Sequence, residues 1–174
     1  MCAIIGFDSP TLTEQEIRPY FDRTISRGPD MSRMEKAGRG MLGFHRLAIM
    51  GLHEEGMQPF HLGGDMAVCN GELYGFRPLK KELEAKGYTF ASESDCELIL
   101  PLYREYGVEM FAKLDAEFAM IIYDAKADRL VAARDPIGIR PLFYGYSKSS
   151  HQIAFASEMQ NLIGWCDDIR PFPI

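Results

Sequence analysis

The fold class of this chain is decided by the stretch Phe118-Ala119-Met120-Ile121-Ile122-Tyr123. Its residues are apolar at successive positions, which is typical of a strand covered on both faces. The polar run at 124–128 predicts a turn, and the apolar residues 130–133 predict a returning strand. We therefore expect an antiparallel hairpin at the centre of the second half of the chain.

Further strands and helices are predicted on either side of this hairpin. The strands are expected at 3–7, 40–50, 65–69, 142–146 and 153–156, and the helices at 14–27, 77–86 and 108–114. Thr13 is a suitable cap for the first helix, and Ser94-Asp95-Cys96-Glu97 reads as the capping box of another. Strands, then helices, then a run of strands favour an α+β domain with helix-covered antiparallel sheets.

Length and composition exclude several classes of protein. The chain has 174 residues, of which 47% are hydrophobic and 25% charged, as expected for one globular domain spanning residues 1–174. A net charge of −6 argues against a nucleic-acid binder, and no apolar run approaches the roughly 20 residues that a membrane span needs. The N-terminus carries no secretory signal pattern, so we expect a cytoplasmic protein with reduced thiols.

No metal site is expected. The four cysteines form no C-x-x-C pair, and the four histidines complete no zinc pattern. Cys69 and Cys166 read as small core or near-surface residues. Asp65 and Asp128 read as solvated residues of polar turns, and no phosphate-binding loop is present.

Cys2 stands directly after the initiator methionine. Removal of Met1 would place the thiol of Cys2 and its own α-amine on neighbouring atoms. The amine has a reference pKa of about 7.7–8.0, so a useful fraction is neutral near pH 7 and can take the thiol proton. This is a complete nucleophile–base pair in one residue, although position alone favours an incidental cysteine.

Other clusters have ordinary structural interpretations when each is taken alone. Arg27-Gly28-Pro29-Asp30 is a turn, Asn70-Gly71-Glu72 is a hairpin signal, and the segment from Arg134 to Leu142 is a strand end with a turn. Arg46 is different, because a charged residue in an apolar strand costs several kcal/mol without a partner. It therefore needs a carboxylate from the protein or from a ligand.

Taken together, these segments resemble one family. They are Cys2–Gly6, Arg27–Asp30, His45–Ile49, Gln58-Pro59, Asn70–Tyr74, Ser94–Glu97, Arg134–Leu142 and Ala156–Met159. In this order and spacing the chain resembles the class II glutamine amidotransferases, and within them the glutaminase domain of glutamine-dependent asparagine synthetase. The resemblance runs from Cys2 to residue 174 and implies a four-layer αββα sandwich of the N-terminal-nucleophile hydrolases.

The resemblance also implies a reaction and a role for each site residue. Cys2 would attack the side-chain amide of glutamine, the side chain of Asn70 and the N–H of Gly71 would hold the oxyanion, and water would release glutamate. Arg46 would bind the substrate carboxylate, and Glu72 and Asp95 its ammonium group. The backbone of Leu47, Ala48, Ile49 and Met50 would line the same pocket. Because the α-amine supplies a base, His45 reads as a strand neighbour rather than a catalyst.

The identity of the ammonia acceptor stays open at this point. The resemblance implies an ATP-dependent asparagine synthetase, whose ATP and Mg²⁺ would bind a C-terminal synthetase domain or partner subunit that this chain lacks. The glutaminase step itself implies no cofactor. The alternatives are a different acceptor of the ammonia, or a degenerate domain that only binds glutamine or docks a partner. A homodimer is compatible with the sequence, and the chain reads as an excised or truncated N-terminal domain.

Overall fold

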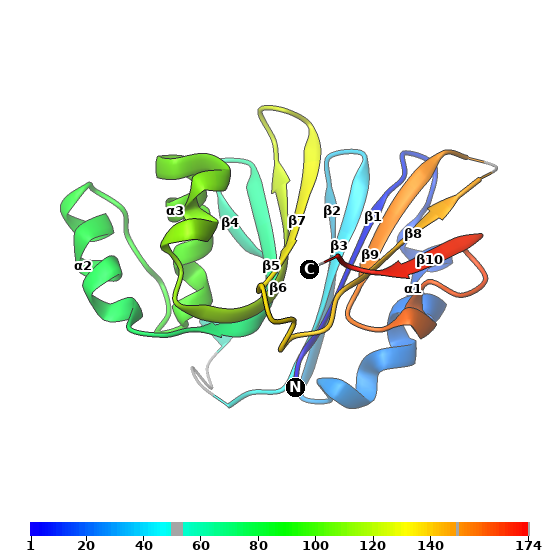
Figure 1. Ribbon diagram of the computed structural model, residues 1–174, viewed down its shortest axis with the longest axis horizontal. Coiled ribbons are helices and arrows are strands. Elements are labelled where there is room, and N and C mark those ends of the chain that lie inside the picture. Colours follow the sequence, from blue (N-terminus) through cyan, green and yellow to red (C-terminus); the bar gives the residue numbers. More distant parts are fainter. Residues whose placement is uncertain (50–53, 149, 174) are drawn as a thin grey trace.

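Two antiparallel β-sheets face each other in the computed structural model, which describes residues 1–49, 54–148 and 150–173 (Figure 1). Sheet A consists of β1 (Ala3–Asp8), β2 (Met31–Ala37), β3 (Gly40–Arg46), β8 (Phe143–Ser147), β9 (Gln152–Ala156) and β10 (Asp168–Pro171). Sheet B consists of β4 (Phe60–Leu62), β5 (Asp65–Leu73), β6 (Ala116–Asp124) and β7 (Arg129–Arg134). Their spatial orders are β10-β8-β9-β1-β3-β2 and β4-β5-β6-β7.

Helices cover the outer face of each sheet. Helix α1 (Glu14–Phe21) continues as the 3₁₀ segment η1 (Asp22–Arg27) and packs on sheet A, whereas α2 (Phe76–Ala85) and α3 (Ile99–Tyr106) cover sheet B (Figure 1). The predicted cap is confirmed, because the hydroxyl of Thr13 accepts from the N–H of Glu16 at the start of α1. The structure is therefore the expected αββα sandwich. No helix in the described residues is long and apolar enough to cross a bilayer.

Strand β6 shows why a continuous apolar run marks the middle of this fold. Ala119 and Ile121 belong to the core between the two sheets. Met120 and Ile122 belong to the core between sheet B and its helices. Because successive side chains of a strand point to opposite faces, a strand between two cores must be apolar at every position. The predicted hairpin is confirmed as β6 and β7.

The strands that the sequence pattern did not predict all lie at sheet edges. Strands β2 and β10 form the two edges of sheet A, and β4 forms one edge of sheet B. Strand β2 reads Met-Ser-Arg-Met-Glu-Lys-Ala, since an edge strand tolerates charge and is protected by it from unwanted pairing. The predicted strand 40–50 was too long, because β3 ends at Arg46.

The predicted capping box at 94–97 is wrong. Ser94 makes no side-chain capping bond, and the chain enters α3 through the 3₁₀ segment η3 (Asp95–Leu98). The carboxylate of Glu97 instead accepts from the backbone N–H groups of Ala91 and Ser92, at 2.7 and 2.8 Å. Glu97 therefore stabilises the preceding loop rather than the helix start.

Candidate active site

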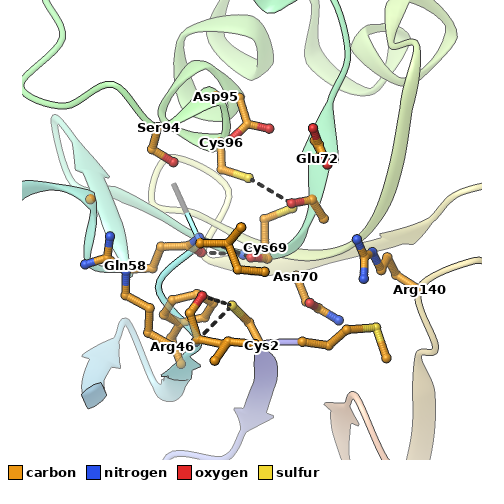
Figure 2. A pocket seen from close by; sticks show the side chains of 16 residues that line it. Cys2, Arg46, Gln58, Cys69, Asn70, Glu72, Ser94, Asp95, Cys96 and Arg140 are labelled. Carbon is orange, nitrogen blue, oxygen red and sulfur yellow. Dashed lines mark hydrogen bonds between the residues drawn. The ribbon is translucent and has the colours of Figure 1, made fainter. Parts of the chain in front are cut away.

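A pocket of about 140 Å³ opens where the two sheets meet at the start of β1 and the end of β3 (Figure 2). It contains most of the residues that the sequence nominated for chemistry. They are Cys2, Arg46, Leu47, Ile49, Asn70, Gly71, Glu72 and Asp95. Segments far apart in the chain therefore converge here. Met50 lies outside the described residues, so its predicted place in the pocket stays a prediction.

Cys2 is half-buried and is the most accessible of the three thiols that line the pocket. Its Sγ lies 3.6 Å from the carbonyl oxygen of Leu47, to which the thiol donates, and the N–H of Leu47 lies 3.4 Å from Sγ. Burial raises the pKa of the Cys2 thiol. The sulfur is therefore held as a neutral thiol, and a base must remove its proton before it can act as a nucleophile.

The backbone of β1 beside Cys2 is held by residues from distant parts of the chain. The Nε of Arg27 donates to the carbonyl oxygen of Cys2 at 3.1 Å, and the same guanidinium pairs with Glu158 at 2.8 Å. The hydroxyl of Ser157 accepts from the N–H of Ile4 at 2.9 Å. The sequence analysis placed these segments in the family resemblance but assigned no role to Arg27, Ser157 or Glu158. The structure shows that they fix the start of β1.

The loop after η1 supports the end of β3. A Cβ atom on Gly28 would lie 2.3 Å from the carbonyl carbon of His45, so only glycine allows this close approach. The N–H of Asp30 donates to the carbonyl oxygen of Arg46 at 3.1 Å, and its carboxylate accepts from the N–H of Ala48 at 2.8 Å. The N–H of Ala48 is thus engaged by Asp30, and Ala48 is not among the described residues that line the pocket.

Asn70 and Gly71 lie inside β5 and not at a hairpin turn. A Cβ atom on Gly71 would lie 2.4 Å from the carbonyl oxygen of Glu117 on β6, which explains the glycine. The side chain of Asn70 is only 3% exposed, and its Nδ2 has no hydrogen-bond partner among the described residues. Buried donors are nearly always paired. Asn70 therefore offers a donor to a ligand in this pocket.

Charged side chains of both signs complete the pocket. Arg46 is 3% exposed, and its Nη1 lies 3.7 Å from the sulfur of Met31. Asp95 is buried and accepts from the N–H of Leu73 at 2.5 Å, whereas Glu72 is exposed at the rim. Figure 2 places Asp95 and Glu72 together, on the side of the pocket away from Cys2. A zwitterion can be matched by one cation and two carboxylates.

Eight of the described residues that line the pocket were not predicted as site residues, and four of them carry polar or thiol groups with notable contacts: Gln58, Cys69, Cys96 and Arg140. Cys69 and Cys96 are buried side by side, and the Cys69 thiol together with burial raises the pKa of Cys96. Arg140 pairs with Glu117 of β6, and Gln58 contacts the backbone of Cys69. Gln58 and Arg140 could have been found from the sequence, because both lie in the segments that carry the family resemblance, Gln58-Pro59 and Arg134–Leu142.

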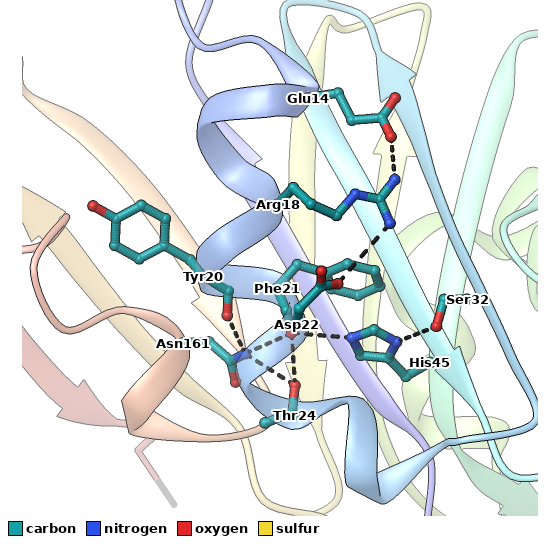
Figure 3. A network of polar contacts seen from close by, with 9 residues as sticks. All are labelled: Glu14, Arg18, Tyr20, Phe21, Asp22, Thr24, Ser32, His45 and Asn161. Carbon is teal, nitrogen blue, oxygen red and sulfur yellow. Dashed lines mark hydrogen bonds and ion pairs between the residues drawn. The ribbon is translucent and has the colours of Figure 1, made fainter.

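His45 lies on the other face of β3 and takes no part in the pocket. Its Nε2 donates to the carbonyl oxygen of Phe21 at 3.0 Å, and its ring stacks on that of Phe21 with the centroids 3.6 Å apart. Its Nδ1 lies 2.7 Å from the hydroxyl of Ser32 (Figure 3). The interpretation of His45 as a structural neighbour agrees with this geometry.

The interpretation of Asp65 as a solvated residue is wrong. Asp65 is buried and accepts from Nε of Arg104 at 3.0 Å and from the N–H of Ala125 at 2.9 Å. Such a carboxylate joins β5 to α3 and to the turn after β6. Asp128 accepts from the hydroxyl of Tyr123 at 2.9 Å. Within the described residues, no group of three or more His, Cys, Asp or Glu side chains is arranged to hold a metal ion.

The chain is similar to known proteins over nearly its whole length. The sequence model of a family described as the glutamine amidotransferase domain matches residues 1–170. A probable glutamine-hydrolysing asparagine synthetase from Dictyostelium discoideum is 42% identical, over 99% of this chain and 32% of that protein. Asparagine synthetase B from Escherichia coli is 38% identical, over 99% of this chain and 32% of that protein.

Two further similarities are more distant. Amidase chry2 from Gibberella zeae is 35% identical, over 94% of this chain and 25% of that protein. The solved glutamine phosphoribosylpyrophosphate amidotransferase from B. subtilis has a TM-score of 0.74 and 20% identity, over 92% of this chain and 43% of that chain, which shows a shared fold. The chain thus spans about a third or less of the length of these curated relatives.

Proposed function

Because the chain belongs to the family of glutamine amidotransferase domains, we propose that it hydrolyses the side-chain amide of glutamine to glutamate and ammonia. One observation carries this proposal. The half-buried thiol of Cys2 shares a pocket with the buried, unpartnered amide nitrogen of Asn70. A nucleophile beside a free donor is the arrangement that acyl transfer needs.

The proposed first step forms a thioester. Met1 is attached to Cys2 in the structure, so the reaction requires its removal to expose the α-amine of Cys2. The neutral amine then takes the thiol proton, sulfur bonds to the amide carbon, and the C–N bond breaks as the ammonium form returns its proton to the leaving ammonia. Water then hydrolyses the thioester, which releases glutamate and restores the thiol. The raised pKa of Cys2 explains why the step needs that base.

Asn70 and Gly71 are proposed to stabilise the oxyanion of the tetrahedral intermediate. The free Nδ2 of Asn70 supplies one donor and the backbone N–H of Gly71 the other. A preorganised donor of this kind lowers the barrier by about 2.7–4 kcal/mol in other acyl-transfer enzymes. Both donors lie on β5, a strand paired along its length with β6, so they do not need to reorganise during the reaction.

The two charged ends of the amino acid are proposed to be bound separately. Arg46 would take the α-carboxylate, because a planar guanidinium binds a carboxylate with two parallel hydrogen bonds. Glu72 and Asp95 would bind the α-ammonium group. Asp95 would use Oδ1, because its Oδ2 already accepts from the N–H of Leu73. The backbone of Leu47 and Ile49 would line the same pocket, as is predicted for Met50, and Ala48 would act through the loop that Asp30 holds.

The destination of the ammonia is proposed from the relatives. Those from Dictyostelium discoideum and Escherichia coli are named asparagine synthetases. We infer that residues 1–174 form the glutaminase domain of such a cytoplasmic enzyme, and that ATP and Mg²⁺ bind the synthetase part that amidates aspartate. A different acceptor of the ammonia is the alternative that the sequence analysis left open. Replacing aspartate by other carboxylates in an amidation assay with the complete protein distinguishes the two.

Replacement of Cys2 by alanine tests the reaction itself. We expect Cys2→Ala to abolish ammonia release from glutamine, because no other thiol of the pocket is accessible. Glutamine should still bind, since Arg46, Glu72 and Asp95 are untouched. Ammonia release is measured enzymatically, binding by calorimetry, and intact mass shows whether Met1 has been removed.

Two results would contradict the proposal. Turnover by Cys2→Ala at the wild-type rate would exclude a thioester at this residue. A wild-type chain that lacks Met1 and binds glutamine without releasing ammonia would instead be the degenerate binding domain.

A further inference from the structure

Gln58 is a buried residue of the pocket for which the proposed reaction has no task. Its side-chain amide makes two hydrogen bonds with the main chain of one residue of β5. The N–H of Cys69 donates to Oε1 at 2.5 Å, and Nε2 donates to the carbonyl oxygen of Cys69 at 3.1 Å (Figure 2). Both main-chain polar groups of Cys69 are thus satisfied by one side chain.

The pairing of β4 with β5 explains why this contact is needed. The two strands pair over Phe60↔Ala67, His61↔Met66 and Leu62↔Asp65. If the same register continued towards the pocket, the residue opposite Cys69 would be Gln58. Strand β4 begins only at Phe60, however, so the side chain of Gln58 takes the place of a ladder partner. This edge of β5 is therefore bonded by an amide side chain rather than by a strand.

The opposite edge of β5 is fixed at the same level by β6. Asn70 pairs with Ala119 and Gly71 with Phe118. Gln58 holds Cys69, and the next two residues, Asn70 and Gly71, supply the proposed oxyanion donors. The segment 69–71 is therefore clamped from its two edges, by a strand on one side and by a single side chain on the other.

We propose that Gln58 is a positioning residue that sets the location of the Asn70 and Gly71 donors; this inference rests on the proposed glutaminase reaction. Donors must be held within about 0.5 Å of the productive geometry to stabilise a transition state. Without Gln58, the buried N–H and carbonyl of Cys69 lose their partners, and this part of β5 shifts or admits water to satisfy them. We expect substrate binding to change little, because Arg46 lies on β3 and Asp95 is held by the N–H of Leu73, and neither contacts Gln58 through a hydrogen bond that would be lost.

The variant Gln58→Glu separates positioning from packing. Its carboxylate keeps the acceptor for the N–H of Cys69 but cannot donate to the carbonyl oxygen until it is protonated. Burial and the facing carbonyl raise the pKa of such a carboxyl group. We expect kcat at pH 8 to fall roughly tenfold or more, with KM and the glutamate affinity within about twofold of wild type. The ratio of variant to wild-type kcat should rise as the pH falls towards 5.5.

Two further variants complete the comparison. Gln58→Met has a similar volume and no polar group, so its kcat should be low at every pH. Gln15→Glu makes the same chemical change at an exposed position of α1 and should match wild type throughout. Thermal unfolding shows that each variant is folded, and if Gln58→Met does not fold, the pH profile of Gln58→Glu decides alone.

The inference is overturned by a pH-independent ratio for Gln58→Glu, by kcat within twofold of wild type in both Gln58 variants, or by a loss that appears only in KM. These failures differ from failure of the proposed function. If wild-type protein lacking Met1 releases no ammonia, the reaction itself is excluded. If wild type is active and the Gln58 variants are equally active, only the role of Gln58 is excluded.

Discussion

Asn70 shows how a single residue can indicate a ligand. Its amide nitrogen is buried and has no partner among the described residues, although buried donors in folded proteins are nearly always paired. The neighbouring Gly71 cannot carry a side chain without meeting β6. Packing against β6 accounts for the glycine at 71, whereas the unpartnered nitrogen of Asn70 is accounted for if the substrate brings an acceptor atom, as the proposed reaction requires.

Replacement of Asn70 by alanine should act on the chemical step. We expect Asn70→Ala to lower kcat by about 10²–10³-fold, which is the cost of one oxyanion donor in comparable enzymes. KM should change little, because the charged ends of glutamine are bound elsewhere. Steady-state kinetics measures both constants, and glutamate binding by calorimetry is the control. A variant with unchanged kcat and raised KM would assign Asn70 to substrate binding instead.

At the scale of elements, a buried polar network joins three parts of the chain (Figure 3). The carbonyl oxygen of Phe21, at the junction of α1 and η1, accepts from His45 of β3 at 3.0 Å and from Asn161 at 3.2 Å. Because a carbonyl only accepts, Nε2 of His45 carries a hydrogen. Burial lowers the pKa of His45 and so favours the neutral ring, in which Nδ1 accepts from the hydroxyl of Ser32.

This neutral histidine predicts that stability depends on pH. Burial lowers the pKa of His45 in the folded chain below its ordinary value of 6.5. The unfolded chain then binds the proton more tightly, so the free energy of unfolding is highest above pH 6.5 and falls as the pH drops below it. Each unit of pKa difference corresponds to about 1.36 kcal/mol.

Urea unfolding at pH 7.5 and 5.5 measures this effect. His45→Gln should reduce the difference between the two pH values, whereas His151→Asn, at an exposed turn, should leave it unchanged. If His45→Gln retains the full difference, another group causes the pH dependence.

The same scale shows what the sequence could predict. Central strands such as β6 can be recognised from their continuous apolar sequence, because both of their faces are buried. The edge strands β2, β4 and β10 cannot be recognised in this way, since a strand paired on one side only tolerates polar and charged residues. The residues proposed to carry the chemistry can be selected from the sequence by type and order, but the sequence assigns no role to Gln58 or Arg27. Their roles depend on the register between segments that only the folded chain brings together.

At the scale of the whole molecule, the pocket is shared by the two sheets. Cys2 directly precedes β1 and Arg46 ends β3, both in sheet A, whereas Asn70 and Glu72 lie on β5 of sheet B. A ligand that contacts residues of both sheets binds to an arrangement of side chains that exists only while the two sheets are packed together. Binding is therefore coupled to the stability of the entire domain.

Glutamate, the proposed product, should raise the melting temperature of the chain. At a hundred times its dissociation constant, a ligand that binds only the folded state adds about 2.7 kcal/mol. For a domain of this size that corresponds to roughly 5–10 °C. Differential scanning calorimetry measures the shift, and Arg46→Met should remove it. An equal shift in Arg46→Met would place the bound carboxylate elsewhere.

The hydrogen bonds from Ile4 to Ser157 and from Arg27 to Glu158 can form only after residues 157 and 158 have been synthesised. A ribosome adds about 5–20 residues per second, so roughly 8–30 s separate the appearance of the first strand from that of Glu158. Until then β1 lacks β9, its neighbour in sheet A. The nascent N-terminus therefore stays open to processing enzymes until the residues around 158 have been synthesised and β9 can pair with β1.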